Sequence, residues 1–281
     1  MSQFSPSFDL SITRDDLRFI AQVVHSHAGI VIREHKEAMA RGRLARRVKA
    51  LGLTSVAEYC ALLRRPEGAS EIGELINAVT TNHTSFFRER HHFDHLRQAV
   101  LPSLMEITHR PAGRVRLWCS ASSSGEEPYS IAACVHDAFK GPPKGDFRIL
   151  ATDIDSDILR RAEAGRYASE AVERMPADLR PLLKLEATQT PGEYRVPDAI
   201  RRLVTFKRLN LIEPWPVSGP FDVIFCRNVL IYFDQPTTSD IIDRFVEVLR
   251  PGGWLYLGHS ESRPHLHPSL EVIGRTIYRR K

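Results

Sequence analysis

The stretch Arg114-Val-Arg-Leu-Trp-Cys-Ser-Ala-Ser-Ser-Ser-Gly-Glu-Glu-Pro128 decides the fold. Its first residues form an apolar run typical of a buried strand, and a series of small residues follows and ends at a proline. Proline is favoured in the first turn of a helix. We therefore predict a strand over Arg114–Trp118, a tight loop, and a helix over Pro128–Phe139.

The same alternation continues beyond this stretch. A second helix is predicted over Thr238–Leu249, where Pro251-Gly-Gly253 stops it. Four further apolar runs are typical of strands: Phe147–Thr152, Leu203–Lys207, Phe221–Cys226 and Trp254–Gly258. Strands that alternate with helices predict an α/β fold, a doubly wound and mostly parallel sheet with helices on both faces.

Two segments depart from this rhythm. Gly165–Ala199 is rich in charge and proline, and we interpret it as an inserted small subdomain. Glu271–Arg279 follows a turn and is predicted to be a terminal strand.

The residues before this region form a helical part. Thr13 and Asp16 have the spacing of a capping box, and Gly29 stands where the first helix ends. Apolar residues at helical spacing predict four more helices, over 40–51, 55–63, 72–79 and 88–101. The predicted domains are a helical N-terminal domain over 1–85, a connecting helix and linker over 86–112, and the α/β domain over 113–281, with its insertion at about 165–199.

The composition is that of a globular protein in a reducing compartment. Of the 281 residues, 42% are hydrophobic and 26% are charged, so the chain can bury a full core without disulfides. The four cysteines show no CxxC spacing, which indicates reduced, buried thiols. The first ten residues lack the pattern of a signal peptide, and no apolar run approaches the roughly 18 residues of a membrane span. These features predict a cytoplasmic protein without membrane insertion.

Positive charge is concentrated in one predicted helix. Seven basic residues and two glutamates lie between Arg33 and Lys49, within a chain of net charge +5. Such a segment is typical of a surface that binds an acidic partner, and equally of a solvated helix face.

The predicted sheet indicates where a ligand binds. In a doubly wound sheet the binding crevice lies beyond the carboxyl ends of the strands. A phosphate site there favours a helix start without negative charge, whereas Glu126 and Glu127 occupy this one. Two carboxylates suit a cation or a hydroxyl-rich ligand, which argues against a nucleoside triphosphate.

Polar residues follow two further strands. Asp153 ends the second strand, where an acidic residue holds ribose hydroxyls in many nucleotide sites, although a helix cap is the alternative. Arg227 and Asn228 interrupt an apolar run at the end of Phe221–Cys226. A ribose acceptor together with carboxylates in place of phosphate-binding groups favours a cationic nucleoside, and S-adenosylmethionine with its sulfonium is the natural candidate.

Five strings resemble the CheR-type chemotaxis receptor methyltransferases: Thr80-Thr-Asn-His-Thr-Ser-Phe-Phe-Arg88, Ser123-Ser-Gly-Glu-Glu-Pro-Tyr-Ser130, Ala151-Thr-Asp-Ile-Asp155, Gly219-Pro-Phe-Asp-Val-Ile-Phe-Cys-Arg-Asn-Val229 and Gly258-His-Ser-Glu261. They are long, keep one order and span most of the chain. The resemblance implies a helical domain, a methyltransferase domain with a small antiparallel subdomain, and esterification of glutamate side chains on chemoreceptors with S-adenosylmethionine as methyl donor.

The resemblance also implies site residues. Nine positions would contact the cofactor: Asn82, Thr84, Arg88, Glu126, Asp153, Asn210, Leu211, Asn228 and Val229. Arg88 suits the methionine carboxylate, because a guanidinium can hold a carboxylate with two hydrogen bonds. The glycine-rich first loop of the broader methyltransferase class is replaced by serines, with only Gly125 kept.

The chemistry needs no general base, because a glutamate with a pKa of about 4.3 is already ionised near neutral pH. The substrate carboxylate must still be aimed, and Tyr232 is the first candidate, with Arg227 and Arg97 behind it; the alternative for Tyr232 is a core aromatic. Receptor methylation helices are rich in glutamate and glutamine. We therefore expect five basic residues to dock them, namely Arg41, Arg43, Arg46, Arg47 and Lys49.

Other functions fit the sequence less well. His91 and His95 share a helix face, but no further ligand stands out, so no metal site is predicted. A nucleic-acid methyltransferase would carry an Asn/Asp-Pro-Pro-aromatic run after the fourth strand, where this chain has Arg227-Asn-Val-Leu230, or a nucleophilic cysteine after proline, whereas Cys226 follows phenylalanine. A catalytically silent receptor-binding adaptor is the third possibility.

Overall fold

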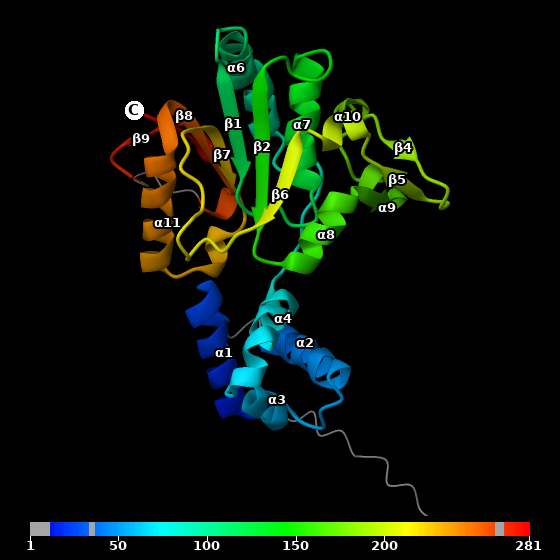
Figure 1. Cartoon of the computed structure of the whole chain (residues 1–281), viewed down its shortest axis with the longest axis vertical. Helices are drawn as coiled ribbons and strands as arrows, with labels where there is room; N and C mark the ends of the chain where they lie inside the picture. Colours follow the sequence, from blue (N-terminus) through cyan, green and yellow to red (C-terminus); the bar gives the residue numbers. More distant parts are fainter. Residues whose placement is uncertain (1–11, 34–36, 262–266) are drawn as a thin grey trace, which may run out of the picture. The chain divides into compact units, whose positions relative to one another are not determined.

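The computed structural model describes residues 12–33, 37–261 and 267–281, which form two compact units (Figure 1). The helical unit contains the described residues up to Thr81 together with Tyr232–Thr237. The sheet unit contains Asn82–Ile231 and Thr238–Lys281. The connecting helix expected over 86–112 thus belongs to the sheet unit, and a short segment far along the chain groups with the helices. Lys36, His265 and the first ten residues lie outside the described residues.

The helical unit consists of α1 (Arg14–Ala28), α2 (Glu37–Ala50), α3 (Val56–Leu63) and α4 (Ala69–Val79). Thr13 forms the predicted capping box, because its Oγ1 accepts from the Asp16 amide at 3.1 Å while Asp16 accepts from the Thr13 amide at 3.2 Å. Its core buries aliphatic residues of all four helices: Ile20, Val24, Leu44, Val48, Val56, Leu63, Leu75 and Val79. Leu51, predicted to face inward, is 38% exposed, because it follows the last residue of α2.

The main sheet of the other unit has the strand order β6-β2-β1-β7-β8-β10-β9. Its strands are β1 (Arg114–Cys119), β2 (Asp146–Asp153), β6 (Val204–Arg208), β7 (Phe221–Cys226), β8 (Leu249–Leu257), β9 (Leu270–Gly274) and β10 (Ile277–Arg280). The first five are parallel to one another, and β10 pairs antiparallel with β8 and β9. The chain moves outward from β1 through β2 to β6 and then returns to β7 on the other side of β1. The strand order therefore reverses between β1 and β7.

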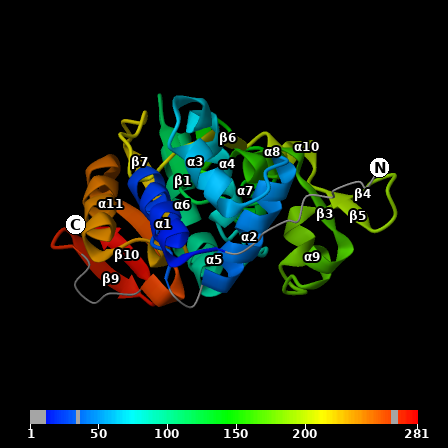
Figure 2. The same cartoon turned by 90° about the horizontal axis from the view of Figure 1, so that it is seen from below.

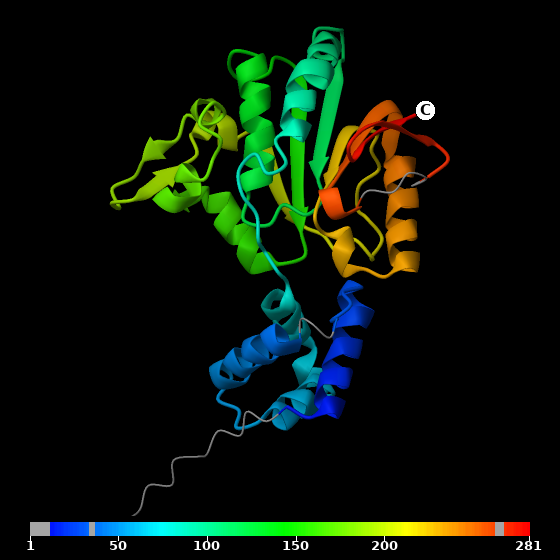
Figure 3. The same ribbon diagram turned by 180° about the vertical axis from the view of Figure 1, so that it is seen from behind.

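Helices cover both faces of this sheet. They are α5 (His91–His95), α6 (Leu101–Thr108), α7 (Glu126–Ala138), α8 (Ser156–Ala164), α10 (Asp198–Arg201) and α11 (Gln235–Val248). Leu117 and Cys119 share a core with α6 and α7, which Figure 3 shows over one face. Trp118 points to the opposite face, where its ring packs against Phe245 of α11. The doubly wound α/β fold predicted from the alternation is confirmed.

The insertion forms its own small sheet in the order β3-β5-β4, from β3 (Arg166–Ala168), β4 (Glu186–Ala187) and β5 (Glu193–Arg195), with α9 (Ser169–Glu173) beside it. All its pairings are antiparallel. Figures 1 and 2 show it next to α8 and α10, at the opposite side of the sheet unit from β9.

Three elements differ from the sequence prediction. The strand expected over Trp254–Gly258 is β8, which begins at Leu249 and includes Pro251-Gly-Gly253. The helix expected over 88–101 is α5, a π-helical turn over Leu96–Val100 and α6, so helical structure continues to Thr108. The tail predicted as one strand is a hairpin of β9 and β10. No helix in the described ranges combines the length and apolar character that crossing a membrane requires.

Candidate active site

The loops after β1 and β2 meet at the carboxyl edge of the sheet. The Ser122 amide donates to the Thr152 carbonyl at 2.8 Å, which joins the two loops. Gly125 precedes α7 with a φ of 98°, and a Cβ there would lie 2.7 Å from the Tyr167 hydroxyl. Only glycine therefore fits this turn, which explains why it is the one glycine left in a serine-rich loop.

Asp153 ends β2 and is held by two backbone amides. Its Oδ2 accepts from Ser123 at 2.8 Å and its Oδ1 from Asp155 at 3.1 Å. Burial raises the pKa of Asp153 to about 6, so the carboxyl group is mostly ionised at neutral pH. The helix cap belongs to Asp155 instead, whose Oδ1 accepts from the amides of Asp157 and Ile158 at the start of α8. Asp153 is thus not needed as a cap.

The segment that precedes α5 lies against these loops. The Asn82 side chain donates to Asp155 Oδ2 at 2.7 Å, and the Asn82 backbone carbonyl accepts from the Ser123 hydroxyl at 3.2 Å. Thr84 is half-buried in the same segment. Arg88 donates to the His83 carbonyl at 3.0 Å. The structure therefore brings Asn82 together with the loops that carry Asp153.

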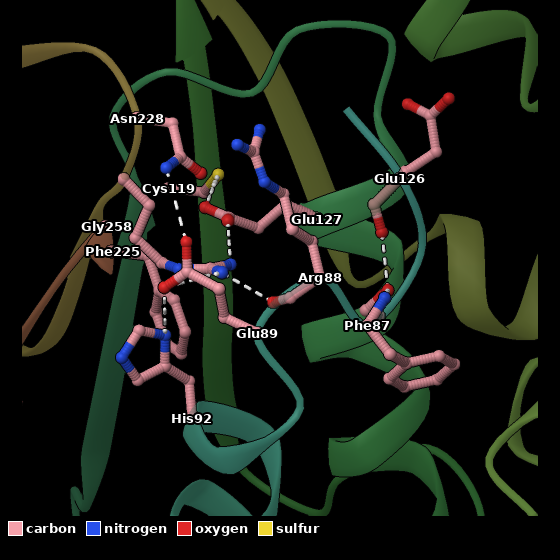
Figure 4. Close-up of polar contacts among 12 residues, drawn as sticks. Phe87, Arg88, Glu89, His92, Cys119, Glu126, Glu127, Phe225, Asn228 and Gly258 are labelled. Atoms are coloured by element: carbon pink, nitrogen blue, oxygen red, sulfur yellow. Dashed lines mark hydrogen bonds and ion pairs between the residues drawn. The ribbon is translucent and has the colours of Figure 1, made fainter. Parts of the chain in front are cut away.

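The two glutamates that begin α7 have different surroundings. Glu126 is buried and accepts from the Ser124 hydroxyl at 2.6 Å, and burial raises its pKa. Glu127 instead accepts from the Cys119 thiol at 3.2 Å and from the guanidinium of Arg227. Figure 4 shows the two carboxylates pointing in opposite directions. Of the two, Glu126 has no arginine partner within the described residues and is the one suited to a ligand.

Arg227 is the centre of a buried polar network. Its side chain is fully buried, donates to Glu127 and to the Arg88 carbonyl, and lies 3.5 Å from Glu89. Glu89 also accepts from the Asn228 side chain at 3.3 Å (Figure 4). Burial opposes ionisation of Glu89, but Arg227 and the hydrogen bonds of His259 and Asn228 outweigh it and hold its pKa below the ordinary value. Arg227 thus joins the β7 end to the Arg88 segment.

A second buried carboxylate, Glu261, organises the loop after β7. Its Oε2 accepts from the amides of Gly258 at 2.6 Å and Asn228 at 2.9 Å, and its Oε1 from Leu230 at 2.7 Å. A Cβ on Gly258 would lie 2.5 Å from the Asn228 side chain, so that position also requires glycine. Sequence reasoning assigned no role to Glu261 or Glu89; the string Gly258-His-Ser-Glu261 was the available signal for the first.

Two further predicted cofactor residues follow β6. The Leu209 amide donates to the Asp153 carbonyl at 3.0 Å, which places Asn210 and Leu211 beside the end of β2. The Asn210 side chain donates to Glu213 at 3.0 Å. Val229 lies after β7, half-buried and next to Asn228. The predicted cofactor residues thus follow the carboxyl ends of β1, β2, β6 and β7 or lie in the segment packed against them.

Arg97 lies elsewhere in the sheet unit. It is 3.6 Å from Asp137, near the last residue of α7, whereas Glu126 is its first. Eleven residues of helix separate the two by about 16 Å. Tyr232 belongs to the helical unit, where its carbonyl accepts from the Val31 amide at 2.8 Å. The structure therefore does not bring Arg97 together with the predicted site residues at the carboxyl edge of the sheet.

The five basic residues of α2 are not alike. Arg41 donates to the Ile12 carbonyl at 2.8 Å, and Arg43 donates to carbonyls at the end of α4, including Val79 at 2.9 Å. Arg47 forms a two-bond ion pair with buried Glu71, one bond of 2.6 Å. Arg46 and Lys49 are exposed. Three of the five are thus engaged within the helical unit.

Three side chains come close enough together to be considered as metal ligands. Potential ligand atoms of Glu89, His91 and His92 lie within 4.8 Å of one another, the one such group among the described residues. Arg227 already places a positive charge 3.5 Å from Glu89. Burial, and to a smaller extent the charge of Arg227, lowers the pKa of His92 to about 3. A cation therefore already occupies the electrostatic position that a metal ion would take.

The arrangement fits a cationic, hydroxyl-bearing cofactor. Each Asp153 oxygen accepts one backbone hydrogen bond, and a carboxylate oxygen has room for a second. The Ser122 hydroxyl is buried without a hydrogen-bond partner in the part of the chain that the structure describes. Glu126 adds a carboxylate to which no cationic side chain of residues 12–33, 37–261 and 267–281 is bonded. These groups can receive ribose hydroxyls and an ammonium group.

Comparison with known proteins agrees with this chemistry. The model described as "CheR methyltransferase, SAM binding domain" matches residues 82–279, and "CheR methyltransferase, all-alpha domain" matches residues 15–80. A "Probable chemotaxis protein methyltransferase" of Rhizobium etli is 47% identical over 260 residues, 92% of this chain and 96% of the relative. A "Chemotaxis protein methyltransferase" of Escherichia coli K12 is 40% identical over 271 residues, 96% and 92% of the two chains. With both domains matched along nearly its whole length, the chain belongs to the CheR methyltransferase family and takes S-adenosylmethionine as its cofactor.

Proposed function

We propose that the chain transfers methyl groups to glutamate side chains in the cytoplasmic helices of methyl-accepting chemoreceptors, forming glutamyl methyl esters. The observation that carries the proposal is the pair of buried carboxylates, Asp153 and Glu126, at the carboxyl edge of the sheet in a member of this family. The chemotaxis names of relatives that match more than nine-tenths of the chain support the receptor as substrate.

The proposed cofactor site uses the nine residues inferred from the resemblance. Asp153 would accept from the ribose hydroxyls, and Glu126 would accept from the ammonium of the amino-acid portion. Arg88 would hold the carboxylate of the cofactor's amino-acid portion. The remaining six would border the cofactor: Asn82, Thr84, Asn210, Leu211, Asn228 and Val229.

When bound, S-adenosylmethionine supplies an electrophilic methyl group on a sulfonium. The protein's own task is to orient the glutamate and to exclude water, an effect that can contribute on the order of 7–11 kcal/mol. A glutamate carboxylate is the nucleophile without prior loss of a proton. Of the three residues first considered for aiming it, Tyr232 remains a candidate, whereas Arg227 is buried in an ion pair with Glu127 and Arg97 lies near the last residue of α7.

We propose that receptor helices dock on the exposed part of α2 only. Arg46 and Lys49 are free to meet acidic receptor helices, while Arg41, Arg43 and Arg47 contribute mainly to the fold of the helical unit.

Two measurements test the function against its rivals. Radiolabelled methyl groups from S-adenosylmethionine are expected on a glutamate-bearing receptor fragment as base-labile esters, and not on the same fragment with glutamine in place of those glutamates. Label on bulk RNA instead would favour a nucleic-acid methyltransferase. Calorimetry is expected to detect S-adenosylhomocysteine binding, and no binding at high micromolar concentration would favour a silent adaptor.

A further inference from the structure

His259 stands at the carboxyl edge of the sheet directly after β8, and the sequence assigned it no role. Its Nδ1 lies 3.0 Å from Glu89 Oε1, and its backbone amide donates to the same oxygen at 3.3 Å. The imidazole is nevertheless 49% exposed. One edge of the ring is therefore fixed to a buried carboxylate while the rest reaches solvent.

Glu89 determines which nitrogen of His259 is offered to a ligand. Its carboxylate is 11% exposed and lies 3.5 Å from the Arg227 guanidinium, which favours the ionised form. An ionised carboxylate can only accept hydrogen bonds, so Nδ1 of His259 carries the hydrogen between them. Nε2 is then the outward ring nitrogen.

The position of this nitrogen is tied to the proposed cofactor site. Glu89 Oε1 accepts from both His259 and the Asn228 side chain, so the imidazole and Asn228 share one anchor. The Glu261 carboxylate holds the Asn228 and Gly258 amides on the other side. A carboxylate bound at Nε2 of His259 would therefore lie beside a residue that borders the cofactor.

We propose that His259 binds the substrate glutamate through Nε2, with Glu89 as its positioning residue; this rests on the proposed function. As the substrate carboxylate binds, Nε2 takes up a proton from solvent, because an imidazole between two carboxylates, here Glu89 and the substrate, is stabilised as imidazolium. The incoming side chain is thereby kept charged and aimed. A bond forms between the carboxylate oxygen and the methyl carbon as the bond between that carbon and the sulfonium sulfur breaks, and S-adenosylhomocysteine is the leaving group. The neutral ester then no longer holds the imidazolium, whose proton returns to solvent, and the product is released.

The test compares H259A and H259Q with H109Q, an exposed histidine at the end of α6, near the opposite edge of the sheet. Steady-state methylation of a glutamate-bearing receptor fragment and calorimetry with S-adenosylhomocysteine are measured for each. For H259A, kcat/KM is expected to fall by about tenfold to 100-fold, the effect of losing one charge-assisted hydrogen bond, with cofactor affinity within about twofold of wild type. H259Q keeps a donor amide and should recover part of the rate, and H109Q should match wild type.

A further measurement isolates substrate recognition. Wild-type protein is expected to bind the glutamate fragment more tightly than its methyl ester, and H259A should lose that preference. Unchanged kcat/KM in H259A, or a loss of cofactor affinity as large as the loss of rate, would overturn the assignment. Failure of the wild-type protein to methylate any receptor fragment would instead refute the proposed function itself.

Discussion

Burial disfavours the charged form of Asp153, yet the proposed grip on ribose requires that charge. The two backbone amides that the carboxylate accepts from leave it oriented with capacity for further hydrogen bonds. D153A is expected to weaken S-adenosylhomocysteine binding by about 1.5–3 kcal/mol, the scale of hydrogen bonds to a charged group. Calorimetry measures the effect.

The matched control is D146A. Asp146 is exposed at the other end of β2, where it pairs with half-buried Arg116, so its loss should leave cofactor affinity unchanged. Wild-type affinity in a folded D153A variant, judged by circular dichroism, would contradict the placement of the ribose.

The raised pKa of Asp153 also predicts a pH dependence. Because its folded-state pKa is about 6, protonation below that pH removes the charged acceptor, and cofactor affinity should fall between about pH 7 and 5. The sign for stability is opposite. The folded form holds the proton more tightly than an ordinary carboxyl group, so this stabilisation is complete at low pH and is lost as pH rises through about 6.

Calorimetry across this range checks the affinity, with D153N as comparison. The neutral amide cannot titrate, so D153N should bind more weakly at neutral pH and lose most of the slope. Because burial also raises the pKa of Glu126, E126Q measures the remainder. An equal slope in D153N and wild type would assign the dependence to another group.

The sequence indicated some site residues better than others because of the distance over which they act. Asp153 and Asn228 were predicted because each follows a predicted strand at the edge of the sheet where ligands bind. Glu89 and Glu261 act on groups that are far apart in the chain or on backbone amides, as in the contact of Glu89 with His259, 170 positions away. No local pattern encodes such partners.

At the scale of elements, α2 shows how similar residues acquire different roles. Arg46 and Arg47 are neighbours of the same charge, but only Arg47 faces α4 and its buried Glu71. R47A would leave that carboxylate with the Tyr59 hydroxyl but without its bidentate partner, a loss of about 1–3 kcal/mol in local stability. Hydrogen exchange of α2 and α4 amides is the suitable measurement, because a chain with two compact units need not unfold in one step.

R46A is the matched control, since its side chain is exposed, and exchange in α2 and α4 should remain as in wild type. Equal protection in R47A and R46A would show that the ion pair does not stabilise the unit.

The elements that follow a strong local rhythm were predicted well. Four of the five parallel strands, β1, β2, β6 and β7, correspond closely to the predicted apolar runs, and the cap of α1 corresponds to the spacing of Thr13 and Asp16. Only the second half of β8 was predicted, because Pro251-Gly-Gly253 was interpreted as a helix stop. The π-helical turn over Leu96–Val100 and the hairpin of β9 and β10 were missed. The first keeps the apolar spacing of a continuous helix. The second folds back at Arg275-Thr276, which is not one of the Asn-Gly or Asp-Gly pairs that indicate a two-residue hairpin turn.

At the scale of the whole molecule, receptor docking should depend on the two exposed cations of α2. R46E/K49E is expected to raise the KM for a receptor fragment several-fold at low salt, because it replaces attraction by repulsion. The difference should shrink near 1 M salt, where the Debye length is about 3 Å. Methylation kinetics at two salt concentrations provide the measurement.

Cofactor affinity should stay at the wild-type value in R46E/K49E, since both residues belong to the helical unit. The same KM as wild type at low salt would remove α2 from the docking surface.

The grouping of Tyr232–Thr237 with the helices was not predictable from rhythm, because this segment follows β7 and includes the first residues of α11, most of which belongs to the other unit. The first unit ends at Thr81, whereas the sequence placed the end of the helical domain at residue 85; the alternation of strands and helices begins only at Arg114.

The state of the four cysteines makes the protein convenient for chemical probes. Cys60, Cys119, Cys134 and Cys226 are free and buried, and burial raises the pKa of every one of them. Folded protein should accordingly resist maleimide and mild oxidants, since thiolate is the reactive species. A cysteine introduced at an exposed position such as Lys49 would then be the single site that a fluorophore labels. The four native cysteines would stay unlabelled until the chain unfolds.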